Sequence, residues 1–206
     1  MGQRVRLSTL LGLAFVSGCM NDPANPGAIG LSVLGKASFG YVRGGSTSTY
    51  SATGIISLAT FATDRYTTTF ALGFRDTTST ATAIVSNVPR SSGVSDVLTI
   101  NVNSQGVGTF AIGSSCTAGA ANCTGVIFVV DLNANTGAFT AACTLSSGVV
   151  TIATYSQTSA TGSFSGSGLC AGATGVSTDF SITNGVFDVP VLKGGPTTAR
   201  GPSSVP

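Results

Sequence analysis

The sequence predicts an all-β fold, an antiparallel β-sandwich or barrel-like domain of about 10–12 short strands. Charged residues make up 8% of the 206, against roughly 25% in an average soluble protein, and histidine, tryptophan and glutamate are absent. Helical proteins fill their surfaces with Glu, Lys and Gln, which are scarce here, whereas the abundant Thr, Val, Ile, Phe and Gly favour strands and tight turns. The mean hydropathy of +0.42 also separates the chain from disordered sequences.

Alternation of apolar and polar residues is the second observation that predicts strands. Every second residue from Tyr66 to Phe74 is placed on one strand face, and so are Leu98, Ile100 and Val102. The stretch 187–191 alternates in the same way, and its Pro190 indicates an edge position. Further strands are predicted at 37–43, 48–57, 79–87, 107–112, 125–131, 137–145, 148–155, 158–166 and 178–183.

Val126 to Cys143 is the clearest predicted hairpin, with a polar tip at Asn133 to Gly137. The residues from Asp131 onward also imitate a calcium-binding loop, because oxygen-bearing side chains recur at alternate positions. The twelfth position is Ala142, which offers no carboxylate, so we interpret the segment as a turn and keep weak calcium binding as the alternative.

The N-terminus has the organisation of a secretion signal. Arg4 and Arg6 precede an apolar run at 7–16, which is shorter than the roughly 20 residues that a transmembrane helix needs. Val16-Ser17-Gly18-Cys19 follows and resembles the lipobox of bacterial lipoproteins: an aliphatic residue, two small residues and a cysteine. The alternative is an ordinary signal peptide in which the cysteine is incidental.

The lipobox resemblance implies cleavage before Cys19 and attachment of acyl chains to that residue. Because residue 20 is Met rather than Asp, nothing marks retention in an inner membrane, and an outer membrane is the expected destination where one exists. The expected organisation is a lipoprotein signal peptide at 1–18, a tether at 19–27, a β-sandwich domain at 28–192 and a disordered tail at 193–206.

Four cysteines remain after Cys19, and an even number in an exported chain indicates two disulfides with three possible pairings. We favour Cys116 with Cys123, which would close a Gly- and Ala-rich loop, and Cys143 with Cys170, which would tie neighbouring late strands. The alternative is a zinc site made of the same thiolates, although no C-x-x-C spacing is present. We expect no metal and no cofactor.

Most catalytic arrangements are excluded by composition. Without histidine, Ser-His-Asp and Cys-His sites cannot form, and without glutamate any acid/base pair must come from aspartates. Gly30 to Lys36 fits the first positions of a phosphate-binding loop, but Ala37 replaces the hydroxyl residue that would hold Mg²⁺. We therefore interpret this stretch as a glycine-rich first strand and expect a non-enzymatic protein.

The expected partners follow from charge and location. From Cys19 onward seven basic residues balance seven aspartates without clustering, so nucleic acid is not an expected partner. TGSFSG at 161–166 and TNGVFDVPV at 183–191 are similar to the closing strands of small uncharacterised β-rich envelope lipoproteins. We expect a lipid-anchored envelope protein that serves as a structural or interaction module. It would bind the membrane through Cys19, with an envelope protein or glycan as the candidate further partner. The alternative is a carbohydrate-binding or adhesive surface module.

Overall fold

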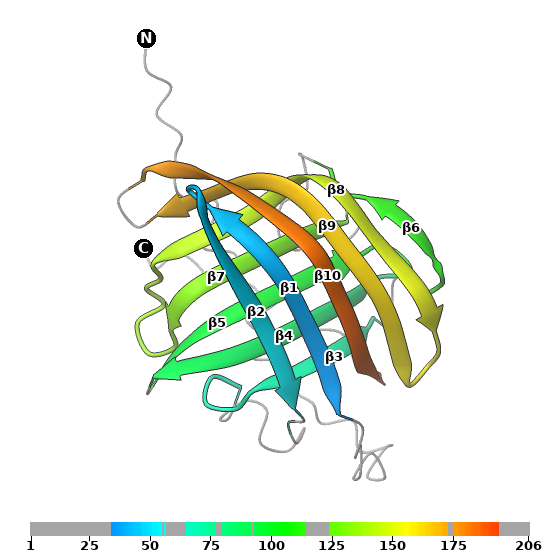
Figure 1. Cartoon of the computed structure of the whole chain (residues 1–206). Coiled ribbons are helices and arrows are strands. Elements are labelled where there is room, and N and C mark those ends of the chain that lie inside the picture. Colours follow the sequence, from blue (N-terminus) through cyan, green and yellow to red (C-terminus); the bar gives the residue numbers. More distant parts are fainter. Residues whose placement is uncertain are drawn as a thin grey trace, which may run out of the picture.

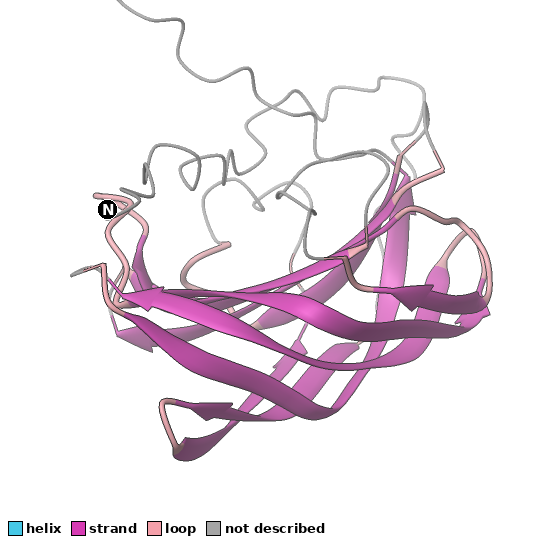
Figure 2. Cartoon of the chain, turned by 90° about the horizontal axis from the view of Figure 1, so that it is seen from above, coloured by secondary structure: helices cyan, strands magenta, loops and turns pink. Residues whose placement is uncertain are grey.

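A computed structural model describes residues 34–54, 56, 65–76, 80–91, 93–113, 124–172 and 175–193. All of their regular structure is strand, which confirms the all-β prediction (Figure 2). The ten strands are β1 (Gly35–Arg43), β2 (Ser46–Gly54), β3 (Phe70–Arg75), β4 (Thr82–Ser91), β5 (Val94–Val102), β6 (Gly108–Ala111), β7 (Gly125–Asn133), β8 (Ala141–Tyr155), β9 (Ser159–Gly172) and β10 (Ser177–Lys193).

Seven strands close a ring in the order β10, β3, β4, β5, β7, β8 and β9, and β9 pairs back with β10. The β1–β2 hairpin joins the ring at β10, and the short β6 joins it at β8. All pairs are antiparallel except β10 with β3, which pair in parallel over three residues. The expected sandwich or barrel-like domain is therefore a closed sheet with two appended edges.

Two long strands, β8 and β10, turn the ring into two layers. The first part of β10 pairs with β1, and residues 191–193 then pair with β3. On the opposite side, residues 141–144 of β8 pair with β7, and residues 149–152 pair with β6. One layer thus contains β2, β1, β10, β9, β8 and β6, and its strands run across β4, β5 and β7 of the other layer (Figure 1).

Aromatic side chains fill the space between the layers. Phe39 of β1 stacks on Tyr50 of β2 with ring centroids 4.9 Å apart, and both meet Phe128 of β7 edge-on at 5.1 and 5.3 Å. Phe164 and Phe180 complete the cluster from β9 and β10. Such pairs contribute about 0.5–1.5 kcal/mol each beyond the burial of their area. The interior is consequently packed with side chains.

The layer of β3, β4, β5 and β7 is also buried on its other face. Phe70, Leu72 and Phe74 share that face of β3, as the alternation predicts, and lie in a second apolar cluster with Ile56. Tyr66, predicted to continue the same strand face, instead lies before β3. It packs against a third apolar cluster, formed by Val97, Ile127, Val129 and Leu132. Burial on both faces explains the continuous apolar runs of β3 and of β7.

The strand prediction was wrong where it divided the two longest strands. Residues 141–145 and the range 148–155 belong to one strand, β8, and 178–183 and 187–191 belong to β10. Residues 137–140 of the first predicted range lie before β8. Gly148 and Asn184 have positive φ angles of 131° and 51°. Asn184 lies within the register shift between Ile182 and Gly185, and Gly148 lies just after the shift between Leu145 and Ser147. Glycine and asparagine supply this conformation in β-bulges as well as in turns, so the sequence pattern imitates two hairpins.

Pro190 also departs from its predicted edge position, because it lies buried within β10 and pairs with Ser159 of β9. On its other side β10 changes partners: pairing with β1 ends at Asp188, and pairing with β3 begins at Val191. A proline is tolerated at this point because neither β1 nor β3, the two partners on that side, pairs with it.

Candidate functional site

Cys19, the predicted lipidation residue, lies outside the described residues, as do the signal peptide, the tether and the tail from residue 194. Gly30 to Val33 of the loop-like motif also lie outside them, while Gly35 and Lys36 begin β1 as the strand interpretation expects. Among the described residues, no helix is long and apolar enough to cross a membrane.

One predicted disulfide is present: Cys143 of β8 is bonded to Cys170 of β9. The two residues lie directly opposite each other in the β8–β9 pairing, and both are buried in the apolar core between the two layers. Their thiols are therefore neither metal ligands nor reactive groups. Cys116 and Cys123 lie outside the described residues, so their pairing stays a prediction.

The predicted hairpin is confirmed, and its polar residues hold the turn. The Asn133 side chain oxygen accepts hydrogen bonds from the backbone N–H of Asn135 at 3.0 Å and of Thr136 at 3.1 Å. Asp131 has a φ of 52° and accepts a bond from the Thr140 hydroxyl at 3.0 Å. These are the contacts of an asparagine-led turn, and they account for the oxygen pattern without a calcium ion.

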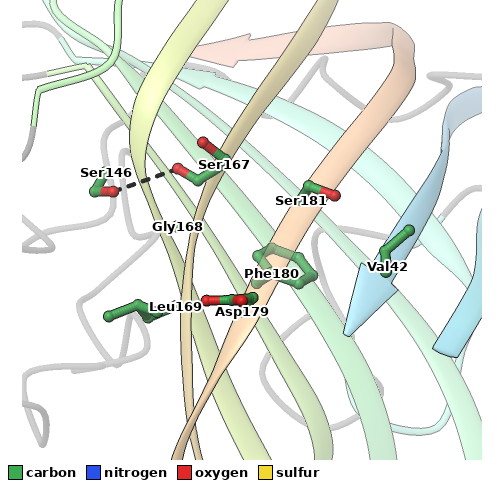
Figure 3. A pocket seen from close by; sticks show the side chains of 8 residues that line it. All are labelled: Val42, Ser146, Ser167, Gly168, Leu169, Asp179, Phe180 and Ser181. Atoms are coloured by element: carbon green, nitrogen blue, oxygen red, sulfur yellow. Dashed lines mark hydrogen bonds between the residues drawn. The ribbon is translucent and has the colours of Figure 1, made fainter. Parts of the chain in front are cut away.

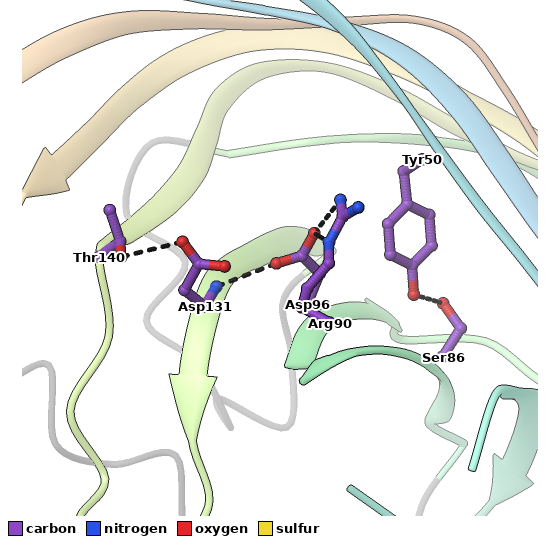
Figure 4. Close-up of polar contacts among 6 residues, drawn as sticks. All are labelled: Tyr50, Ser86, Arg90, Asp96, Asp131 and Thr140. Atoms are coloured by element: carbon purple, nitrogen blue, oxygen red, sulfur yellow. Dashed lines mark hydrogen bonds and ion pairs between the residues drawn. The ribbon is translucent and has the colours of Figure 1, made fainter. Parts of the chain in front are cut away.

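A buried carboxylate forms a polar contact that the sequence analysis did not single out (Figure 4). Asp96 of β5 accepts a bond from Arg90 Nε at 2.7 Å and one from the backbone N–H of Asp131 at 2.9 Å. The Arg90 guanidinium also forms an ion pair with it, and this contact raises the pKa of Arg90. Both carboxylate oxygens of Asp96 are thus engaged.

This network brings two of the aspartates together, which the sequence did not indicate. A hydrolase built on aspartates needs a carboxyl that can exchange protons with substrate in a cleft. The side chain of Asp96 is 1% exposed and already paired with Arg90. The geometry is that of a clasp joining β4, β5 and β7. Arg90 and Asp96 lie on either side of the connection between β4 and β5. The register of this hairpin is therefore the feature that would have predicted their contact.

A second polar contact crosses the interior. The hydroxyls of Tyr50 in β2 and Ser86 in β4 share a hydrogen bond of 2.9 Å between the two layers (Figure 4). Tyr50 is 2% exposed, and its burial raises the pKa of the phenol well above the ordinary value of 10.0. Tyr41 is also buried, whereas Tyr66 and Tyr155 are half-buried, so the four tyrosines do not form an exposed aromatic platform.

The outer face of the layer from β2 to β6 is covered by short hydroxyl side chains. One row crosses six strands, and its members are Ser51, Ser38, Val186, Ser163, Thr151 and Thr109. Neighbouring hydroxyls on this face bond to each other across strands, as the following pairs do: Thr154 with Thr161 at 2.7 Å, Ser147 with Ser167 at 3.0 Å, and Thr109 with Thr151 at 3.1 Å.

An open groove of about 330 Å³ interrupts this face (Figure 3). The Asp179 carboxylate and the exposed Leu169 lie side by side at one end, and Ser167, Ser181 and Val42 lie at the other. The groove combines one carboxylate, several hydroxyls and an apolar side chain. It could hydrogen-bond a polyhydroxylated ligand, but it brings together neither a nucleophile with a base nor a set of metal ligands.

No protein-family model, no curated protein and no solved structure matches this chain.

Proposed function

We propose that this chain is a lipid-anchored cell-envelope protein whose β-domain acts as a non-enzymatic structural or interaction module. The observation that carries the proposal is the lipobox-like Val16-Ser17-Gly18-Cys19 after a short positive and then apolar segment. Two or three acyl chains on one cysteine hold a protein on a bilayer durably, because each buried methylene contributes about 0.8 kcal/mol.

The packing of the domain supports a role performed at its surface. Aromatic rings and the Cys143–Cys170 bond occupy the interior, so the outer face of the layer from β2 to β6 is the described surface available for contact. The hydroxyl-covered face carries few charges, among them Lys36, Asp179 and Asp188. A rigid, nearly neutral sheet suits contact with another envelope component better than it suits electrostatic capture of an ion or a nucleic acid.

The anchor is tested by metabolic labelling with a palmitate analogue. Wild-type chain should incorporate the label and fractionate with membranes, whereas Cys19→Ser should remain unlabelled and unprocessed. Cys143→Ser serves as the control, since it removes a different thiol and should keep the label. Equal labelling of the wild type and Cys19→Ser would refute lipidation at this residue.

A carbohydrate-binding module is the second candidate, and the groove beside Asp179 favours it. A bound sugar would use the carboxylate and the serine hydroxyls as hydrogen-bond partners and Leu169 as an apolar contact. Asp179→Asn should then weaken glycan retention on an array at least several-fold, while Asp188→Asn on the same strand should not. Absence of glycan retention by the wild type would leave the structural or interaction role.

A further inference from the structure

β2 lies at the edge of the sheet. It pairs with β1 along all nine of its residues without a register shift, and within the part of the chain that the structure describes no second strand pairs with it. With respect to the described residues, its far side therefore presents unpaired backbone groups, which form a template for another strand.

The hairpin geometry determines which backbone groups face outward. Gly44 and Gly45 form the two-residue turn, and their φ angles of 54° and 84° are those of a type I′ turn. In such a hairpin the flanking pair, Arg43 and Ser46, is hydrogen-bonded, and hydrogen bonding then alternates along the ladder. The N–H and C=O groups that point away from β1 are therefore those of Thr47, Thr49, Ser51 and Thr53.

This edge lacks the features that usually prevent strand addition. Natural edge strands carry lysines, prolines or bulges, whereas Ser46 to Gly54 contains no charge and no proline. The residues from Ser46 to Thr49 are exposed on both faces of the strand, so nothing in the described part of the chain hinders an approaching strand there.

We infer that β2 pairs with β2 of a second copy of this chain, antiparallel and centred on Thr49. This arrangement places Thr49 opposite its own copy and Thr47 opposite Ser51, so no charges face each other across the new pair. It also extends the hydroxyl pairing that already links Thr109 to Thr151 and Thr154 to Thr161 on the same face. A charged peptide would find no complementary group along this edge.

The inference names the partner of the interaction module proposed above and rests on that proposed role. Anchoring depends on Cys19, which lies in a different part of the chain, so failure of the palmitate labelling and failure of β2 pairing are separate results.

The test is disulfide crosslinking of the full chain in detergent. A hydrogen-bonded antiparallel pair has Cα atoms about 5.5 Å apart, within the range that a disulfide spans, so Thr49→Cys should give a reducible dimer on mild oxidation. Thr183→Cys is the matched control, because Thr183 is exposed in the same row, two strands from the edge. Equal crosslinking of both variants, or none at Thr49→Cys, would overturn the proposal.

Thr49→Pro provides a second measurement that does not rely on oxidation. Proline lacks the N–H that points away from β1, so the substitution deletes two hydrogen bonds of the two-fold pair. The dissociation constant of the dimer should therefore rise on the order of thirtyfold. Thr49→Val should remain dimeric in sedimentation equilibrium. A wild type that is monomeric at all concentrations, or a Thr49→Pro variant that dimerises normally while folded, would contradict β2 pairing.

Discussion

Tyr50 shows how one polar atom is placed in an aromatic interior. Its ring belongs to the packed cluster, and its hydroxyl is satisfied by Ser86 of the opposite layer. Removing the hydroxyl would leave the fully buried Ser86 without this partner, which costs about 1–2 kcal/mol. The contact therefore contributes to holding the two layers in one alignment.

Tyr50→Phe should destabilise the protein at pH 8 but less so at pH 11. The folded-state pKa of Tyr50 is raised, so its stabilising contribution is fully present below about pH 10 and is lost as the pH rises towards the folded value. In that window the wild type loses up to about 1.4 kcal/mol per pH unit from this group, and the variant does not. Denaturant unfolding at both pH values measures the difference in unfolding free energy between the wild type and the variant. A difference that is the same at pH 8 and pH 11 would contradict this account.

The contacts of Asp96 could not be predicted from residue types alone. Composition correctly marks the seven aspartates as the available carboxyls, but it cannot say that Asp96 faces inward beside Arg90. That contact depends on the register of β4 with β5 and on Asp131, 35 residues away in β7. Side-chain chemistry can be read from the sequence, whereas the pairing that gives it a partner cannot.

At the scale of elements, the close packing of β8 and β9 depends on glycines. Gly162 faces the interior, where a Cβ would overlap the Thr151 carbonyl oxygen and the Phe187 ring. Alternation of these glycines with outward-facing serines explains the TGSFSG sequence pattern. The glycines allow a strand with one bulky inward residue, Phe164, to pass close to its neighbours.

Gly162→Ala should lower the free energy of unfolding by about 2 kcal/mol through overpacking. The sign is informative, because glycine to alanine in an unhindered extended strand would stabilise by about 0.4–1 kcal/mol. Ser163→Ala, the adjacent exposed position, should change stability by less than about 0.5 kcal/mol. Thermal unfolding of the pair measures the difference, and a stabilised Gly162→Ala protein would refute the packing argument.

Strand positions could be predicted because alternation is local, but strand ends could not. The dipeptide Asn184-Gly185 is a strong turn signal, and only the continuous pairing of β10 with β9 on both sides makes it a bulge. The groove beside Asp179 could not be predicted either. It is formed by β8, β9 and β10 together with β1, and the pairing of β1 with β10 joins segments more than 130 residues apart, which local patterns do not reveal.

At the scale of the whole molecule, the last described strand, β10, pairs with the first, β1. β10 lies between β1 on one edge and β9 on the other, and it closes the ring through β3. Forming such non-local contacts costs conformational entropy. A disulfide makes this cost smaller, because it lowers the conformational entropy of the unfolded chain. The Cys143–Cys170 bond joins β8 to β9 within the same ring.

The double variant Cys143→Ala/Cys170→Ala should therefore be less stable than the wild type. For a sequence separation of 27 residues, loop-closure entropy corresponds to about 3.5 kcal/mol, or a melting temperature lower by roughly 7–14 °C. Calorimetry measures the shift, and Cys116→Ala/Cys123→Ala is the companion variant, with a smaller expected loss of about 2.5 kcal/mol. An unchanged melting temperature in the first variant would show that the bond does not stabilise the ring.

The central proposal is that this closed β-domain is held on a membrane through Cys19. Intact mass spectrometry of the chain extracted from membranes tests it most directly, because cleavage and acylation both change the mass. The account predicts a protein that begins at Cys19 and carries two or three acyl chains. A mass that retains residues 1–18, or one that begins elsewhere or lacks acyl groups, would contradict it.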